Sequence, residues 1–288
     1  MAISNFEAIK LAEKRLEAAG IEPESIRFVF LERKNWTLTD WLTFMRKPIN
    51  ETDLEMLEND TEKLLQFIPP QYLLGFSEFC GRKLKVTKDT LIPRPETEEL
   101  VMKALAIGDH DLPLNVVDIG TGTGAIALSI ALECPQWKVW ATDISVGALK
   151  TAQSNAKEYG AKILFDMGDI FSPFIFPARD KDDFEQFDLI LSNPPYIAED
   201  ELDDMDESVK RYEPSSALFA ADNGLAFYKR FATQAPLVLK KSGQALLEIG
   251  FRQGVAVKEI MQTAFPERKI EIVKDMAGQD RMIYIHAK

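Results

Sequence analysis

The sequence predicts a doubly wound α/β domain with a mostly parallel sheet, preceded by a small α-helical domain. From residue 96 onward, apolar segments of strand length alternate with helical segments, which is typical of parallel sheets covered by helices on both faces. Residues 1–74 instead show the apolar spacing of short amphipathic helices, interrupted by Gly20 and Pro23. Between them, residues 75–95 alternate apolar residues around glycines, which predicts a β-hairpin linker.

Seven strands are expected within residues 96–288. Five are apolar and mostly separated by helical segments, so they should run parallel. The last two flank a glycine-containing turn and should form an antiparallel pair at the C-terminal end. The expected strands are 115–119, 138–142, 163–166, 187–192 and 245–249, followed by 269–273 and 281–285.

Composition restricts the class of protein. The net charge of −12, most of it contributed after residue 85, argues against stable binding of nucleic acid and suits a basic protein partner. Cys80 and Cys134 are too few for a disulfide framework or a cysteine-rich metal site. No apolar stretch approaches the roughly 18 residues of a membrane span. We therefore expect a soluble, cytoplasmic protein that binds neither a metal nor a membrane.

A glycine-rich loop follows the first expected strand. Glycines in such a loop permit positive φ and let the backbone approach a ligand at the helix N-terminus. A GxGxG loop alone is also compatible with a dinucleotide site or a tight turn. Nicotinamide dinucleotide sites usually have GxGxxG, so the earlier third glycine favours a class I methyltransferase that binds S-adenosylmethionine. The segment has Asp118 before the loop and then Gly120, Thr121, Gly122, Thr123 and Gly124.

Carboxylates at the ends of the next two strands are expected to bind the adenosine of that cofactor. Asp143 ends the second strand about twenty residues after the loop, where a carboxylate can accept hydrogen bonds from both ribose hydroxyls. Asp169 and Ile170 follow the third strand, where a carboxylate and a backbone N–H could bind the exocyclic amine and a ring nitrogen of adenine. The alternative for Asp169 is a helix N-cap before Phe171.

The fourth expected strand ends in the segment NPPY, at the carboxyl edge of the sheet, where α/β proteins bind ligands. Pro194 and Pro195 rigidify the backbone and lack N–H donors, so the loop presents acceptors. The side-chain oxygen of Asn193 and the carbonyl of Pro194 can accept both hydrogens of a planar NH2 group, with Asn193 also close to the cofactor. Tyr196 is expected to stack on the flat target. A rigid turn that merely ends the strand is the alternative.

These acceptors suit methyl transfer to an amide or aromatic amine nitrogen. Such a nitrogen is a poor nucleophile because its lone pair is delocalised. Holding both N–H groups against acceptors favours the pyramidal, charge-developing nitrogen of the transition state and directs its lone pair toward the methyl group. No general base is required before transfer, and S-adenosylhomocysteine is the expected product.

Several segments together resemble the release-factor glutamine N5-methyltransferases, the PrmC or HemK family. NPPY alone is also similar to the signature of DNA adenine-N6 and cytosine-N4 methyltransferases. The further segments are LIPRPETEELV (91–101), VVDIGTGTGAIALSIA (116–131), YEPSSALFAADNGL (212–225) and LLEIGFRQG (246–254).

The resemblance covers essentially the whole chain. It implies that the protein methylates the glutamine of the GGQ loop of class 1 peptide chain release factors, with S-adenosylmethionine as donor. It assigns Gly120 to Gly124, Asp143 and Ile170 to the cofactor and Asn193 to Tyr196 to the glutamine. It also implies that residues 1–74 form a substrate-recognition domain and residues 96–288 the methyltransferase domain.

Two charged segments admit two interpretations each. Arg94 and Glu96 either border the active site or form a salt bridge that anchors the linker. The run Glu199–Glu207 has seven carboxylates in nine residues. It is either a solvated helix face or a surface that steers the basic face of a release factor toward the site.

Two alternative functions remain open at this stage. A DNA adenine-N6 methyltransferase is permitted by NPPY, although the acidic charge and the lack of a basic target-recognition region disfavour it. A catalytically silent scaffold is disfavoured by the intact glycine loop, Asp143 and NPPY.

Overall fold

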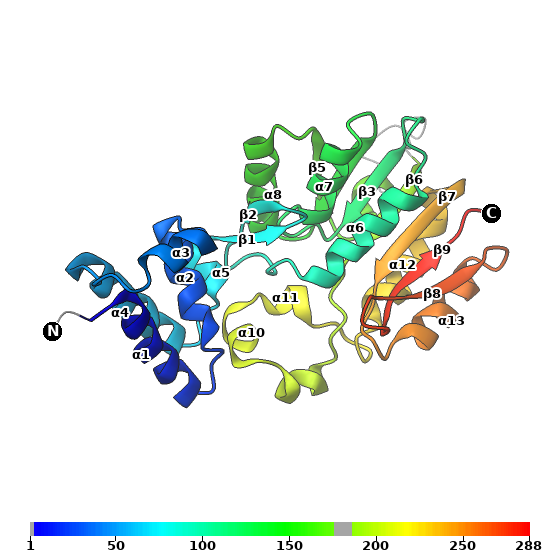
Figure 1. Cartoon of the computed structure of the whole chain (residues 1–288). Helices are drawn as coiled ribbons and strands as arrows, with labels where there is room; N and C mark the ends of the chain where they lie inside the picture. The colour runs from blue at the N-terminus through cyan, green and yellow to red at the C-terminus, as the bar shows by residue number, and fades with distance from the viewer. Residues whose placement is uncertain (1–2, 176–185) are drawn as a thin grey trace. The chain divides into compact units, whose positions relative to one another are not determined.

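The computed structural model describes residues 3–175 and 186–288, apart from the side chain of Asp204. The chain forms two compact units (Figure 1). The first comprises Met1–Phe76 together with Met205–Tyr212, and the second comprises Ser77–Asp204 and Glu213–Lys288.

The first unit is mainly helical among the residues described. Ser4 and Thr37 begin two of its helices with reciprocal capping boxes, and Asn50 caps a third. Its core includes Ile9 and Phe30. The helices are α1 (Asn5–Ala18), α2 (Glu24–Lys34), α3 (Leu38–Phe44), α4 (Glu51–Leu65), α5 (Pro70–Leu74) and α10 (Glu207–Tyr212).

Helix α10 belongs to the helical unit, although the sequence analysis assigned its residues to the α/β domain. The Tyr212 hydroxyl donates a hydrogen bond to the carbonyl of Gln66 at 2.9 Å. The Arg211 guanidinium lies over the Phe67 ring, 4.8 Å from its centroid. These contacts join segments far apart in the sequence, so no local pattern predicts them.

The predicted hairpin consists of β1 (Phe76–Phe79) and β2 (Arg82–Lys85). Nearly all of it groups with the α/β unit, whereas the sequence analysis treated it as a separate linker. The Cys80 N–H donates to Glu98, and the Asn155 side chain exchanges two hydrogen bonds with the backbone of Lys85. The hairpin is thus bonded to two helices of that unit.

The α/β unit contains a seven-stranded sheet in the order β5-β4-β3-β6-β7-β9-β8. The first five strands in this order run parallel and β9 pairs antiparallel with both of its neighbours, which confirms the predicted fold class. The strands are β3 (Asn115–Ile119), β4 (Lys138–Asp143), β5 (Ile163–Met167), β6 (Phe187–Ser192), β7 (Leu239–Glu248), β8 (Ile270–Lys274) and β9 (Asp280–Ile285).

The largest error in a predicted strand boundary is at the start of β7, and the other strand ends differ from the prediction by at most one residue. Strand β7 begins at Leu239, six residues before the expected start at 245. Its first half has polar residues at Lys240, Lys241 and Ser242, so the apolar pattern reveals only the buried second half.

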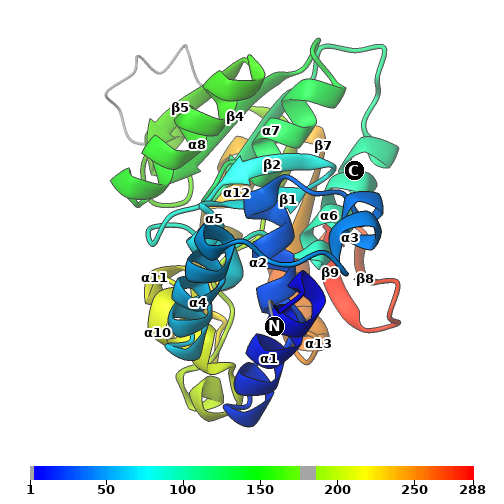
Figure 2. The ribbon, with the colours of Figure 1, turned by 60° about the vertical axis from the view of Figure 1, so that its left-hand side comes forward.

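Helices cover both faces of the sheet. One face packs against α6 (Pro95–Ile107), α7 (Ala125–Glu133) and α8 (Val146–Tyr159), and Figure 2 shows α7 and α8 beside β4 and β5. The other face packs against α9 (Ser172–Ile175), α12 (Ala226–Val238) and α13 (Gly254–Ala264). Val116 and Val117 of β3 point to opposite cores, as alternation along a strand requires.

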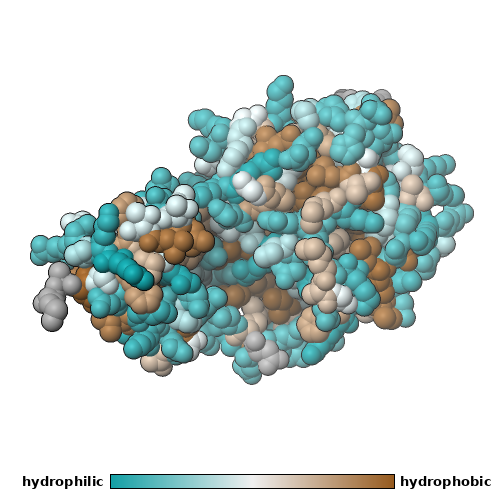
Figure 3. Space-filling model, viewed as in Figure 1, coloured by the Kyte–Doolittle hydropathy of each residue, from teal (hydrophilic) through white to brown (hydrophobic). Residues whose placement is uncertain are grey.

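Among the described residues, no helix is both long and apolar enough to cross a bilayer. The face drawn in Figure 3 is mostly hydrophilic, with hydrophobic side chains scattered across it.

Candidate active site

The glycine loop joins β3 to α7 and lies at the carboxyl edge of the sheet. Gly120, Gly122 and Gly124 have φ values of 72°, 57° and 82°, which side-chain-bearing residues rarely adopt. Asp118 holds the loop from behind: its Oδ2 accepts hydrogen bonds from Thr121 Oγ1 at 2.6 Å and from the Ala127 N–H at 3.2 Å. Burial raises the pKa of Asp118 to about 7. The loop is therefore fixed by its own strand and helix.

Asp143 ends β4 and faces the same loop. One carboxylate oxygen accepts from the Gly122 N–H at 2.9 Å and the other from the Ser145 N–H at 2.8 Å. Burial raises the pKa of this carboxyl, while these N–H groups act in the opposite direction. Each oxygen retains a lone pair, so the carboxylate can still accept bonds from a ligand hydroxyl.

A pocket of about 430 Å³ opens beside the loop. Its wall combines the glycine loop, the ends of β4 and β5, the NPPY loop and parts of α6 and α12. All of these belong to the α/β unit. Of the predicted site residues, the pocket brings together Gly120, Thr121, Gly122, Thr123, Asp143, Asp169, Ile170, Asn193 and Pro195.

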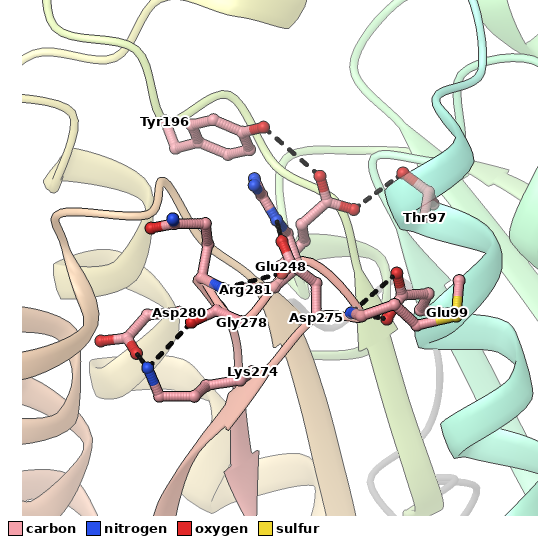
Figure 4. A network of polar contacts seen from close by, with 11 residues as sticks. Thr97, Glu99, Tyr196, Glu248, Lys274, Asp275, Gly278, Asp280 and Arg281 are labelled. Atoms are coloured by element: carbon pink, nitrogen blue, oxygen red, sulfur yellow. Dashed lines mark hydrogen bonds and ion pairs between the residues drawn. The ribbon is translucent and has the colours of Figure 1, made fainter.

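Three predicted site residues are not among the described residues that line the pocket: Gly124, Pro194 and Tyr196. A Cβ on Gly124 would lie 3.1 Å from the Cβ of Ala152, so this glycine permits close packing of α7 on α8. Pro194 is buried, and the Tyr196 side chain points away toward Glu248, as Figure 4 shows.

At the predicted adenine end, Asp169 and Ile170 both line the pocket. Ile170 has a φ of 52°, a left-handed conformation that costs a side-chain-bearing residue roughly 1–2 kcal/mol. Such strain persists where the surrounding structure imposes it, often at ligand sites. The Asp169 carboxylate pairs with Arg230 of α12, and within the described part of the chain no hydrogen bond of a helix cap to this carboxylate is found. Any hydrogen bond from adenine to Asp169 would therefore be made to a carboxylate that is already paired with Arg230.

The NPPY loop follows β6 and is held by hydrogen bonds to other segments of the α/β unit. The Tyr196 carbonyl accepts a hydrogen bond from Gln253 Nε2 at 2.8 Å, and the Ile197 N–H donates to the carbonyl of Leu218 at 3.0 Å. Gly224 has a φ of 77°, and a Cβ there would lie 2.1 Å from the Tyr196 carbonyl oxygen. The loop position therefore depends on the segment 212–225.

Two residues that sequence reasoning missed contact this loop. Asn193 Nδ2 donates to Thr97 Oγ1 at 2.9 Å, and Thr97 Oγ1 donates to Glu248 Oε2 at 2.7 Å. Both Thr97 and Glu248 are buried. Their only signal in the sequence is a carboxylate at the end of an otherwise apolar strand and a threonine in the first turn of a helix.

The structure gives Arg94 a partner other than Glu96. Its guanidinium pairs with Glu213 at 2.6 Å, and Glu213 is 6% exposed. The second Glu213 oxygen accepts from the Ile92 N–H at 3.1 Å. Arg94 therefore anchors the segment before α6 to Glu213 and is not paired with Glu96.

The acidic run forms a 3-10 helix, η2 (Glu199–Asp204), followed by α10. The side chains described between Glu199 and Asp203 are exposed, which agrees with the solvated interpretation. Electrostatic steering of a partner stays a hypothesis.

Solved structures show the fold. A methyltransferase from Pyrococcus furiosus aligns with a TM-score of 0.52 at 17% identity, covering 80% of this chain and 100% of that one. SMU.776, solved with SAH, aligns with a TM-score of 0.50 at 12% identity, covering 72% and 54%. The family model of the methyltransferase small domain matches residues 99–209. Fold and site together define a class I S-adenosylmethionine-dependent methyltransferase.

Sequence relatives identify the family within this class of methyltransferases to which the chain belongs. The release factor glutamine methyltransferase of Enterococcus faecalis is 46% identical over 98% of this chain and 99% of its own length. That of Bacillus subtilis is 40% identical over 96% of both chains. The PrmC N-terminal domain model matches residues 7–75. The chain belongs to the release factor glutamine methyltransferase family.

Proposed function

We propose that this protein acts in the cytoplasm and transfers a methyl group from S-adenosylmethionine to the N5 amide nitrogen of the glutamine in the GGQ motif of class 1 peptide chain release factors. The position of Asn193 carries the proposal. Asn193 lies in the wall of the pocket that the glycine loop and Asp143 also line. Its Nδ2 is bonded to Thr97, while the described residues leave its Oδ1 without a partner. That oxygen can accept a hydrogen bond from a target NH2 group.

The donor half of the pocket fits S-adenosylmethionine. A Cβ on Gly120 or Gly122 would meet nothing within 4 Å, so the loop leaves space along its backbone for a ligand. Asp143 offers carboxylate lone pairs for ribose hydroxyls. No metal is part of the proposed reaction.

When bound, S-adenosylmethionine supplies an electrophilic methyl carbon on a sulfonium sulfur and leaves as S-adenosylhomocysteine. Asn193 Oδ1 would accept one hydrogen of the glutamine amide, whereas Pro194 does not line the pocket and is not assigned the second hydrogen. This arrangement holds the nitrogen and stabilises the positive charge that develops on it during transfer. As the N–C bond forms, the S–C bond breaks, and one hydrogen then leaves the cationic nitrogen as a proton to solvent water, so no base is required before transfer.

The acceptor is assigned to glutamine mainly from the family. Relatives named release factor glutamine methyltransferase match nearly the whole chain, including the helical region. The net charge of −12 also suits a basic protein partner better than a DNA strand. These observations favour glutamine over the adenine of DNA.

Mass spectrometry tests the proposal directly. The purified protein is incubated with a release factor and isotope-labelled S-adenosylmethionine, and the peptide containing GGQ is sequenced. We expect one methyl group on the glutamine side chain and none when that glutamine is replaced by glutamate. A duplex containing adenine serves as the competing substrate. Methylation of the duplex with an unmodified GGQ peptide would overturn the assignment.

A further inference from the structure

A short chain of hydrogen bonds lies behind Asn193. Asn193 Nδ2 donates to Thr97 Oγ1 at 2.9 Å, and Thr97 Oγ1 donates to Glu248 Oε2 at 2.7 Å. The other Glu248 oxygen accepts from the Tyr196 hydroxyl at 3.3 Å. Figure 4 shows Thr97 and Tyr196 converging on Glu248 from opposite sides.

We infer that Thr97 and Glu248 are positioning residues, which orient the Asn193 amide so that its oxygen faces the methyl acceptor. This inference rests on the proposed function and adds two residues to it. Neither is proposed to touch the reacting atoms. Their role would be to select one of the two orientations that an asparagine amide can adopt.

The direction of the hydrogen bonds follows from the chemistry of the groups. An ionised carboxylate only accepts, so Glu248 requires the single hydroxyl hydrogen of Thr97. Thr97 Oγ1 then has only lone pairs left for Asn193 and must meet its NH2 end. The same orientation results however the amide atoms are assigned, because the opposite one would place two acceptors against each other.

Burial makes this selection strong. Thr97 is 4% exposed and Glu248 is 1% exposed, so water does not readily replace either partner. A reversed amide would place the Asn193 oxygen against the lone pairs of Thr97 Oγ1, so two buried acceptors would face each other without a hydrogen. This arrangement is more unfavourable in the interior than at a surface. Two orientations that would be nearly equivalent in water thus become unequal here.

The surroundings of Glu248 control its ionisation. Burial raises the pKa of its carboxyl to about 7. The Thr97 hydroxyl, the Arg281 charge and the Tyr196 hydroxyl act to lower it, while Glu96 acts to raise it.

Two further groups complete this environment. The Tyr228 hydroxyl of α12 donates to the backbone carbonyl of Glu248 at 2.7 Å. Asp275, in the turn after β8, accepts a hydrogen bond from the Arg281 guanidinium at 3.1 Å, and this bond holds the cation in place.

The charge state of Glu248 determines which group donates and which accepts in the hydrogen bonds that link it through Thr97 to Asn193. A protonated carboxyl can donate to Thr97, whose own hydrogen would then turn toward Asn193 and favour the reversed amide. The ionised form is the one that orients Asn193 for the acceptor. Activity should therefore be present above the pKa of Glu248 and be lost as the pH falls through it.

Matched substitutions at Thr97 separate positioning from packing. Thr97→Val removes the hydroxyl at nearly constant volume, and we expect kcat to fall by at least about tenfold, with KM and S-adenosylhomocysteine affinity within about threefold of wild type. Thr97→Ser keeps the hydroxyl and should retain kcat within about threefold. Wild-type kcat in Thr97→Val, or equal loss in both variants, would overturn the inference.

The pH dependence supplies a second test. In wild type, kcat should decline below about pH 7, the pKa that burial gives Glu248. In Glu248→Gln the group no longer titrates, so kcat should be lower at high pH and its acidic decline should disappear. An identical pH profile in both proteins would contradict the role of Glu248.

A third measurement does not depend on methyl transfer. In protein labelled with 15N-asparagine and saturated with S-adenosylhomocysteine, the side-chain NH2 signal of Asn193 is identified by its loss in Asn193→Ala. Its shift should titrate with Glu248 in wild type and stop titrating in Thr97→Val. A titrating signal in a protein that leaves GGQ unmethylated would refute the proposed function alone. If the chemical shift of the Asn193 NH2 group does not change with pH in wild type, the proposed coupling of Asn193 to Glu248 is refuted.

Discussion

The two halves of the pocket are built in different ways. In the donor half, the hydrogen bonds that hold the glycine loop join residues 3 and 21 positions apart, Thr121 with Asp118 and Gly122 with Asp143. In the acceptor half, the bonds behind Asn193 span 96 positions to Thr97 and then 151 to Glu248. The donor half is thus a local structure, whereas the acceptor half exists only once the sheet has assembled. Substitutions in the two halves should therefore affect different steps.

The largest effect is expected in the acceptor half. Asn193→Ala removes the oxygen that would hold the target amide, and loss of such an oriented contact lowers kcat by about 100-fold or more. Affinity for S-adenosylhomocysteine should change little, because the glycine loop and Asp143 are intact. Single-turnover kinetics and calorimetry measure the two quantities separately. A loss of kcat below about tenfold would rule out this acceptor mechanism.

The contrast between the halves also explains which site residues the sequence could predict. Glycine spacing and polar residues at strand ends are local patterns, and the residues they single out include Gly122, Asp143 and Asn193, which line one pocket. Thr97 and Glu248 carry no local pattern of function, because their partners lie in other strands and helices. Pairing across the sheet had to be known before either could be assigned.

In the donor half, Asp143→Ala should mainly weaken cofactor binding. The change removes a carboxylate that accepts from the Gly122 and Ser145 N–H groups and that would accept from ribose. Hydrogen bonds to a charged group contribute about 1.5–3 kcal/mol each, so affinity for S-adenosylhomocysteine should fall by about tenfold or more. At saturating donor, kcat should recover most of its wild-type value. Calorimetry that found unchanged affinity would exclude a ribose contact.

The fold illustrates the same limit of sequence analysis. Strands β3 and β6 were predicted with correct ends because all but one residue of each is buried. The first half of β7 and the placement of α10 were missed, since each depends on partners distant in sequence. Local periodicity therefore predicts which segments are buried. Long-range pairing determines how far an exposed strand extends and which unit a helix joins.

A smaller effect is expected for Gly122→Ala. Gly122 has a φ of 57° and open space at its Cβ position, so the added methyl would occupy the pocket beside the loop. Backbone strain should lower the free energy of unfolding by about 1 kcal/mol, and cofactor affinity should fall several-fold. Gly160→Ala is the control, because Gly160 has a φ of 65° and equal free space at the end of α8. If both variants lose affinity equally, strain and not the added methyl is responsible.

The smallest effect is expected for Tyr196→Phe. The hydroxyl donates to Glu248 over 3.3 Å, a long bond, so its loss should change kcat at high pH by no more than about threefold. Burial raises the pKa of Tyr196, so the hydroxyl is protonated and donates at every working pH. Removing this donor destabilises the ionised carboxyl and raises the pKa of Glu248. The acidic decline of kcat should then move to higher pH. A loss of kcat as large as that of Asn193→Ala would mean that the hydroxyl itself contacts the substrate, despite its orientation toward Glu248.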